Sequence, residues 1–420
     1  MLSLSMNGTP TWKGHPLPLP PKERSVLSLL LRHRPNPVGK EEIIQYAWPF
    51  QSSVSDASIA RCINQIRRAL PQICIEAIYG FGYKLLPESV PTYDFLAEIS
   101  HAAPEIGEQF LHAMDLTRQR TITGLSQALE IFREITRAHP DYVPARLMLA
   151  QTIGVIIALG LSRHLHTHIL EAWEHVRTAS QLAPDAPLLS TAHAWLCDLE
   201  WNFSEADALH QTSLKTMPHI PDVLLPHVWH LIATNRVDQA LQTQQAIVKQ
   251  HPYSPYARIT LARMLSYSGR INEALQEVLL ARKSHPNNLI VENSYIYYLA
   301  TVSPNPDLLE RARYLNTLDD LPTSLKLSYP YVLACCGCND HAYDAINAVL
   351  RNTNDLETRL VLTNAMLKLG DMEGAATEIM SAYQARYARL PYILRSPLHA
   401  PLKQFPRMQE IWFDIFGKYA

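Results

Sequence analysis

A regular repeat runs through the middle of this 420-residue chain. Four alanines follow one another at a constant step of 34 in the numbering: Ala172, Ala206, Ala240 and Ala274. A proline follows each of them twelve residues later, and the same spacing joins Ala128 to Pro140. A small residue lets the second helix of a pair pack closely on the first, and a proline ends that helix. The pattern predicts an α-solenoid of paired helices.

The period is that of tetratricopeptide repeats, which the array resembles. The clearest unit covers residues 257–286, with Gly269 in the turn between its two helices. We expect degenerate units around Ala345 and at 369–376, and an amphipathic terminal helix at 407–416 that caps the stack. Repeats of this kind present an extended surface to other proteins, so the resemblance implies a protein partner or self-association.

The most apolar stretch of the chain runs over the sixteen residues from Leu147 to Ser162. It contains Gln151 and Thr152, and a membrane span needs roughly 20 apolar residues. We therefore expect a buried helix of a soluble fold rather than a span. The step from Ala128 to Ala172 is 44 instead of 34, which predicts an insertion near residues 150–168.

The cysteines and the N-terminus indicate a reducing compartment. There are six cysteines in 420 residues, and three of them cluster at 335, 336 and 338, which is not the pattern of a disulfide framework. The N-terminus has no basic start followed by an apolar run, so no signal peptide is expected. These features predict a cytoplasmic protein without a membrane partner.

The charge is divided unevenly along the chain. Residues 1–86 carry ten Lys and Arg against five Asp and Glu, whereas the remainder carries 27 against 34. A basic segment on an acidic body is typical of a part that binds a polyanion. Pro87 and Pro91 interrupt any helix between the two. We therefore predict one domain at 1–86, a linker at 87–104 and a repeat domain at 105–420.

Within the basic domain, a helix is predicted at residues 55–70, with Ser55 as its N-cap. One face is apolar and contains Ile59, Ile63, Ile66 and Leu70. The opposite face carries Ser58, Arg61, Gln65 and Arg68, and Arg and Gln can contact guanine and adenine edges in a major groove. An ordinary solvated helix face explains this helix alone equally well.

The elements around this helix favour DNA binding. Two helices, the first beginning at residues 20–21 and the second at about 40–47, precede it, and residues 73–85 alternate around Gly80 and Gly82 as in a β-hairpin. This order predicts a winged helix-turn-helix. Four segments then resemble the OmpR/PhoB-type winged-helix DNA-binding domain: L-P-P-K-E (19–23), E-E-I-I-Q-Y-A-W (41–48), I-N-Q-I-R-R-A-L (63–70) and Y-G-F-G-Y-K-L (79–85). The predicted fold class is mainly α, a winged helix with small β-sheets followed by the helical repeats.

The resemblance implies a role for individual positions. The helix at 55–70 would enter the major groove with Arg61 and Gln65 at base edges. Positions near phosphates would be Ser58, Cys62, Asn64 and Arg67, and Arg68 would add charge on the exposed face. The wing at 77–85 would lie along the minor groove. Tyr79 stands where the family often has arginine, so it would stack on sugar or contact phosphate, and Lys84 remains as a wing charge.

The whole plan, a winged helix followed by repeats, resembles the HilA-like invasion-gene activators of enteric bacteria. That resemblance implies a DNA-binding transcriptional activator of virulence or type III secretion genes, located with the nucleoid. Its partners would be double-stranded promoter DNA, RNA polymerase or another regulator, and a second copy of itself. An actinobacterial-type regulator with a winged head and a repeat domain is a similar alternative.

Two alternatives from other classes remain open. The first is a repeat scaffold or adaptor without sequence-specific DNA binding. The second is an enzyme that uses Cys335, Cys336, Cys338 and His341, although structural zinc sites need four regularly spaced ligands. No G-x-x-x-x-G-K-[ST] phosphate loop is present. We therefore expect no catalytic residue, no metal and no cofactor.

Overall fold

The computed structural model describes residues 2–5, 9–12, 15–49, 54–70, 73, 75–78, 81–86, 104–162, 164–218, 220–252, 254–318 and 326–417. The chain forms two compact units. The first contains residues 1–152 with the short segments 177–186 and 217–220, and the second contains the rest. The predicted linker falls almost entirely on 87–103, outside the described residues. The compact unit that holds the winged helix thus continues into the first helices beyond it, past the predicted boundary at residue 86.

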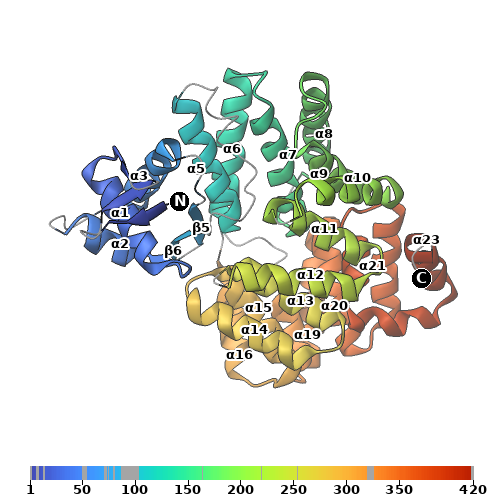
Figure 1. Ribbon diagram of the computed structural model, residues 1–420. Helices are drawn as coiled ribbons and strands as arrows, with labels where there is room; N and C mark the ends of the chain where they lie inside the picture. Colours follow the sequence, from blue (N-terminus) through green and yellow to red (C-terminus); the bar gives the residue numbers. More distant parts are fainter. Residues whose placement is uncertain are drawn as a thin grey trace. The chain divides into compact units, whose positions relative to one another are not determined.

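The N-terminal elements form a winged helix (Figure 1). In chain order they are β1 (Leu2–Leu4), β2 (Pro10–Trp12), β3 (His15–Pro16), α1 (Pro21–His33), β4 (Val38–Gly39), α2 (Lys40–Ala47), α3 (Asp56–Ala69), β5 (Ile75–Ile78) and β6 (Gly82–Leu85). One antiparallel sheet has the order β1-β2-β3 and the other the order β4-β6-β5. The predicted mixture of helices, small sheets and a hairpin is confirmed.

The core of this domain lies between its three helices and the wing. Its fully buried side chains come from every helix and include Val26, Leu27, Leu30, Ile43, Ile59, Ile63 and Ile66. Gly82 is needed where β6 pairs with β4, because a Cβ there would lie 1.9 Å from the carbonyl oxygen of Val38. A glycine at this position therefore lets the wing close on the helices.

The remaining described elements are almost all helical. They are α5 (Pro104–Gln119), α6 (Ile122–Ala138), α7 (Val143–Ala158), α8 (Leu165–Leu182), α9 (Leu189–Leu199), α10 (Phe203–Thr216), α11 (Pro221–Ala233), α12 (Val237–Gln250), α13 (Pro255–Tyr267), α14 (Ile271–Ser284), α15 (Leu289–Val302), α16 (Asp307–Thr317), α18 (Ser328–Cys335), α19 (Asn339–Asn352), α20 (Leu356–Leu369), α21 (Met372–Gln384), α22 (Leu390–Ile393), η1 (Pro397–Gln404) and α23 (Pro406–Phe416).

The alanine and proline repeat has the predicted structural role. The five alanines lie in α6, α8, α10, α12 and α14, and every one of them is fully buried: Ala128, Ala172, Ala206, Ala240 and Ala274. Each matched proline comes two residues after the end of the same helix. A larger side chain at these alanines would have to push neighbouring helices apart. The predicted array of helix pairs is confirmed.

A turn in the left-handed backbone region recurs with the same period. It falls at Trp201, Asn235 and Gly269, with φ values of 64°, 63° and 76°. These positions are spaced by the same step as the alanines and join the two helices of successive pairs. Of these three positions, only Gly269 is a glycine, the residue type that predicts a left-handed turn from the sequence. The turn geometry is therefore set by the packing of the helix pair and not by a glycine in each unit.

The less regular units are also helix pairs. Gly370 has a φ of 83° between α20 and α21, and Ala375 behind it is fully buried, as predicted for 369–376. The predicted unit around Ala345 is present as the pair α18 and α19, although its fully buried alanine is Ala342, one turn of helix earlier. The predicted terminal helix is present as α23, which buries one face.

The apolar stretch at 147–162 forms most of α7, and its side chains from Leu147 to Ala158 are all buried. It is thus the buried helix that the sequence predicts. None of the described helices combines the length and the apolar character needed to cross a bilayer. The longer spacing of the first repeat agrees with the length of α7 and α8, which have 16 and 18 residues.

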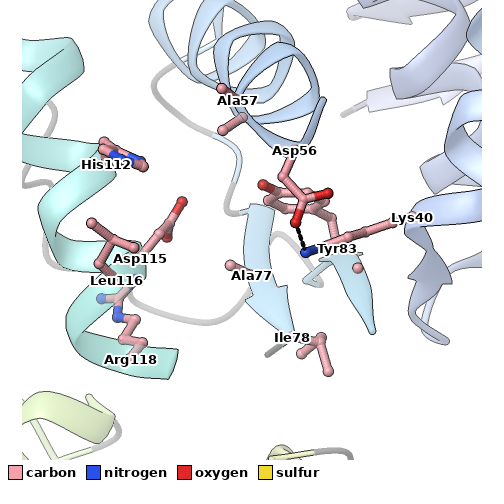
Figure 2. A pocket seen from close by; sticks show the side chains of 12 residues that line it. Lys40, Asp56, Ala57, Ala77, Ile78, Tyr83, His112, Asp115, Leu116 and Arg118 are labelled. Carbon is pink, nitrogen blue, oxygen red and sulfur yellow. Dashed lines mark hydrogen bonds and ion pairs between the residues drawn. The ribbon is translucent and has the colours of Figure 1, made fainter. Parts of the chain in front are cut away.

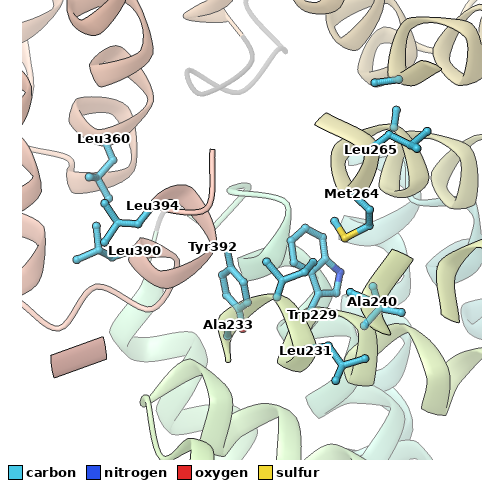
Figure 3. Close-up of a cluster of buried hydrophobic side chains, with 14 of the residues drawn as sticks. Trp229, Leu231, Ala233, Ala240, Met264, Leu265, Leu360, Leu390, Tyr392 and Leu394 are labelled. Carbon is cyan, nitrogen blue, oxygen red and sulfur yellow. The ribbon is translucent and has the colours of Figure 1, made fainter. Parts of the chain in front are cut away.

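The C-terminal segment packs back onto an earlier repeat within the second unit (Figure 3). The rings of Trp229 in α11 and Tyr392 in α22 meet edge to face, with centroids 5.3 Å apart. The indole nitrogen of Trp229 also donates a hydrogen bond of 3.1 Å to the Tyr256 hydroxyl. These contacts join α11, α13 and α22 in one core.

Candidate nucleic-acid interface

The helix α3 begins and ends as its sequence predicts. The Ser55 side chain accepts a hydrogen bond of 3.3 Å from the backbone nitrogen of Ser58. Asp56 lies in the positive first turn, and Arg67 and Arg68 lie in the negative last turn. The apolar face is buried against the winged-helix core at Ile59, Ile63 and Ile66. The anchored face therefore determines which side chains face outward.

The outward face of α3 carries the predicted donors and cations. Ser58, Arg61, Gln65 and Arg68 are all exposed, and the Arg61 side chain is 71% exposed. This face is polar and positively charged along the length of one helix, which is the size that a major groove accepts. The arrangement can present two base-reading side chains, Arg61 and Gln65, with cations beside them.

Three other predicted contact residues lie inside the protein. Cys62, Asn64 and Arg67 are 3%, 2% and 5% exposed. Burial raises the pKa of the Cys62 thiol to about 12, and the Arg67 guanidinium donates to the carbonyl oxygen of Ile75 at 2.6 Å and to the Asn64 side chain at 3.0 Å. This arrangement does not offer these three side chains to a phosphate. Cys62 is buried in the winged-helix core beside Glu23, whereas Asn64 and Arg67 are hydrogen-bonded where α3 meets β5 and α5. Their role in DNA contact stays a prediction that requires the chain to rearrange.

The wing is described only in part. Tyr79 and Gly80 lie outside the described residues. Lys84 lies on β6, where the strand register pairs it with Glu76 on β5. Lys84 is half-buried, so its role as a wing cation stays a prediction.

The helix α5 packs against α3 through ion pairs that are distant in the sequence. Glu108 contacts Arg61 at 3.6 Å and Arg68 at 4.0 Å between nitrogen and oxygen. Asp115 contacts Arg67 at 3.4 Å. Partners so far apart along the chain give no local signal in a sequence, so these contacts could not be predicted from it.

A cavity of about 160 Å³ lies between the winged helix and α5 (Figure 2). Its walls include the ion pair of Lys40 with Asp56 on one side and His112, Asp115 and Arg118 of α5 on the other. The buried hydroxyl of Tyr83 borders it, and burial raises the pKa of Tyr83. The contact between α5 and the winged helix is therefore polar and incompletely filled.

The winged-helix geometry agrees with the comparison to known families. Residues 14–85 match the family described as transcriptional regulatory protein, C terminal. The N-terminal part of this chain is thus an OmpR/PhoB-type winged-helix domain, a DNA-binding domain of transcription regulators.

Individual relatives are similar over the same segment. The chain is 30% identical over 73 residues to the transcriptional regulatory protein CssR of Bacillus subtilis, which is 17% of this chain and 32% of that protein. It is 31% identical over 75 residues to the transcriptional regulatory protein TctD of Salmonella typhimurium, which is 17% of this chain and 34% of that one. The chain thus spans about a third of the length of these relatives.

Among solved structures, the TPR domain of P58(IPK) is similar with a TM-score of 0.22 and 14% identity. The match covers 71% of this chain and 90% of that one. This likeness is too distant to inform function, and the repeat architecture rests on the helix pairs themselves.

In the described part of the chain, two groups of side chains have the spacing to hold a metal ion. They are His193, Cys197 and Glu205, and Asp198, His210 and His230. The second group is fully buried, and its members already hydrogen-bond to one another. Asp198 contacts His210 Nε2 at 3.0 Å and His230 Nδ1 at 2.6 Å. These contacts link α9, α10 and α11 as a polar core, which sequence analysis did not identify.

The surroundings of Asp198 stabilise its charged form. Burial alone would raise the pKa of Asp198, but attraction to His230 and hydrogen bonds from both histidines outweigh it and lower the pKa. His230 Nε2 also lies 3.0 Å from Asp207, which pairs with Arg236 at 2.7 Å. The network is thus a buried hydrogen-bonded unit that includes two carboxylates, two histidines and Arg236.

Two buried histidines make the stability of the repeats dependent on pH. Burial, together with His210, His230 and Arg236, lowers the pKa of His227 from 6.5 to about 3. Burial lowers the pKa of His399 to about 4. In each case the histidine binds a proton more readily in the unfolded chain than in the folded one. The stabilisation that comes from keeping the histidine neutral is therefore complete above pH 6.5, and it is lost as the pH falls from 6.5 towards the pKa of the histidine in the folded chain.

We expect acidification from pH 7 to pH 5 to lower the free energy of unfolding by about 2 kcal/mol for each of these histidines. Denaturant unfolding followed by circular dichroism at several pH values measures the slope. In the variant His227→Phe, the free energy of unfolding should depend less steeply on pH. The variant His341→Phe changes an exposed histidine and should leave this dependence unchanged. Equal slopes in the two variants would contradict the assignment.

The cysteine cluster does not have the properties of a reactive site. Burial raises the pKa of the Cys335 and Cys336 thiols, which keeps them protonated at neutral pH. The Cys336 sulfur lies 3.5 Å from the carbonyl oxygen of Asn305, as in a packed helix end. The alternative of an enzyme at Cys335 to His341 therefore gains no support from thiol chemistry.

Proposed function

We propose that this chain is a transcription regulator that binds promoter DNA through α3 and the wing at 77–85. The observation that carries the proposal is the division of α3 into an isoleucine face held in the core and an outward face with Arg61 and Gln65. Arg and Gln make bidentate contacts to guanine and adenine edges in the major groove. The family match over residues 14–85 supports the same use of this helix.

Each proposed contact has a separate task. Arg61 and Gln65 read bases, whereas Ser58 and Arg68 contact phosphates and fix the register on the duplex. Tyr79 and Lys84 contact the minor groove or its sugar-phosphate edge. The phosphate contacts proposed for Cys62, Asn64 and Arg67 require these side chains to leave their present partners.

The helical repeats are proposed to bind a protein, either RNA polymerase, another regulator or a second copy of the chain. The plan of a winged helix with helical repeats supports a HilA-like activator of virulence or type III secretion genes. Such an activator would act in the cytoplasm at the nucleoid, and it would need no catalytic residue or cofactor. Capture of genomic fragments by the full-length chain, followed by transcript measurement with and without it, tests this proposal. Fragments from promoters whose transcription rises are the expected result.

A scaffold without sequence-specific DNA binding is the second candidate, favoured by the extent of the helix pairs. It predicts no enrichment of any sequence in the same capture experiment. It also predicts negligible affinity for duplex DNA at moderate salt, where specific phosphate and base contacts would still hold.

We expect Arg68→Ala to weaken binding to all duplex sequences alike. A cation at a phosphate releases a counterion, so the slope of log affinity against log salt should become less steep by about one unit. Titrations of one specific and one unrelated duplex at several salt concentrations measure this. An unchanged slope would remove Arg68 from the phosphate contacts.

A further inference from the structure

The helix α5 has two faces with different partners. One face is apolar and packs on α6, where the rings of Phe110 and Phe132 lie 5.7 Å apart and Phe110 is fully buried. The other face carries Glu108, His112 and Asp115, which are four and three residues apart and lie on one side of a helix. Two of these three side chains are acidic, and both contact α3.

Those two carboxylates pair with the arginines of the proposed DNA-binding helix. Glu108 lies between Arg61 and Arg68, and Asp115 contacts Arg67. A carboxylate beside an arginine makes the same charge-assisted contact as a phosphate oxygen. The acidic face of α5 thus lies against the cations of α3 that are proposed to meet the DNA.

We propose that α5 is an internal competitor of DNA, whose carboxylates Glu108 and Asp115 neutralise the arginines of α3 and repel incoming phosphates. The inference rests on the proposed DNA-binding function and adds its regulation. Gln65 stays exposed, whereas Arg61, the other side chain proposed to contact bases, is paired with Glu108, so the competition affects the charge of α3 and one of its two base-contacting side chains. DNA must displace α5 in order to bind, and a partner of the repeats that draws α5 away from α3 raises the affinity for DNA.

The contact between α5 and α3 is incompletely satisfied, which favours its release. The buried Asp115 meets Arg67 at 3.4 Å, and its second oxygen, Oδ1, has no hydrogen-bond partner within the described structure. A buried carboxylate that is only partly satisfied contributes little net stability. The cavity of about 160 Å³ beside it leaves part of the contact unfilled.

Both sides keep their own structure when they separate. Arg67 retains its hydrogen bond to Ile75, which holds α3 to β5 of the wing, and its bond to Asn64 within α3. The apolar face of α5 retains its packing on α6. Separation therefore removes the carboxylate partners of Arg61, Arg67 and Arg68 without unfolding either part.

The test compares full-length proteins. The double variant Glu108→Gln, Asp115→Asn removes both carboxylates at nearly constant shape. The matched control Glu130→Gln, Glu134→Gln removes two exposed carboxylates of α6 in the same compact unit. Fluorescence anisotropy measures the Kd for a labelled 30-base-pair duplex and for a duplex captured from genomic fragments. We expect Kd to fall about tenfold or more in the α5 variant and to stay within twofold in the control.

Hydrogen exchange supplies a second readout. Saturating duplex should speed amide exchange in α5 of the wild-type chain, because DNA displaces α5 from its contact with α3. If the double variant fails to fold, Glu108→Gln alone is used, since Glu108 is 41% exposed at the surface.

The outcomes separate the two proposals. Equal and measurable Kd values for wild type and variant, or DNA binding without a change in exchange at α5, would overturn the inference and leave DNA binding intact. No binding by any variant to any duplex at low salt would overturn the proposed function, and the inference with it.

Discussion

Replacing Arg61 or Gln65 by alanine is expected to reduce discrimination between the preferred duplex and a mismatched one by about 5- to 150-fold. A bidentate contact between side chain and base accounts for roughly 1–3 kcal/mol of discrimination. Neither side chain belongs to the core, since both are exposed on α3. The fold should therefore be unchanged, which circular dichroism verifies.

A random-site selection with each variant measures the change in preference base by base. The acidic face of α5 should be neutralised in the same background, by Glu108→Gln with Asp115→Asn, so that affinity is high enough to compare. Arg351→Ala is the control, because it removes an exposed arginine from α19. Preserved base preference in both α3 variants would refute the assignment of this helix face.

Replacing Asp198 by alanine is expected to lower the free energy of unfolding of the repeats by about 3–5 kcal/mol. Removing a buried carboxylate leaves the buried groups that hydrogen-bond to it without a partner. Here the Asp198 carboxylate hydrogen-bonds to two buried histidines, to His210 Nε2 at 3.0 Å and to His230 Nδ1 at 2.6 Å. Chemical denaturation of the full-length chain at pH 7, followed by far-ultraviolet circular dichroism, measures the loss.

The matched control for this experiment is Asp344→Ala, which removes an exposed carboxylate from α19. Surface changes of this kind usually alter stability by no more than about 0.5 kcal/mol. If Asp198→Ala were no more destabilising than Asp344→Ala, the Asp198 network would not be a structural core, and its role in joining α9, α10 and α11 would have to be abandoned.

The repeat and the helix α3 could both be predicted because their signals are local. Ala206 and Ala240 are buried in their units since a helix pair leaves no room beside them. Ser55 caps α3 because its side chain bonds a backbone group only three residues away. Such features depend on side-chain size, backbone preference and helical periodicity, which short segments express by themselves.

Other features depend on which segments meet in space. The left-handed turns at Trp201 and Asn235 carry no glycine, so only the packing of their helix pairs places the backbone there. Asp198, His210 and His230 look like ordinary surface residues until three helices bring them together. Arg67 lies on the side of α3 that β5 and α5 cover, which helical periodicity alone did not decide.

From its sequence alone, this protein is a winged helix with a basic helix face, followed by helix pairs that recur at a constant interval, because periodic patterns determine secondary structure and the buried face of each element. The tertiary structure alone decided that the arginines of α3 meet the carboxylates of α5. Electrostatic contacts act between residues that are close in space, and the long stretch of chain between these partners leaves no trace of the contact in the sequence.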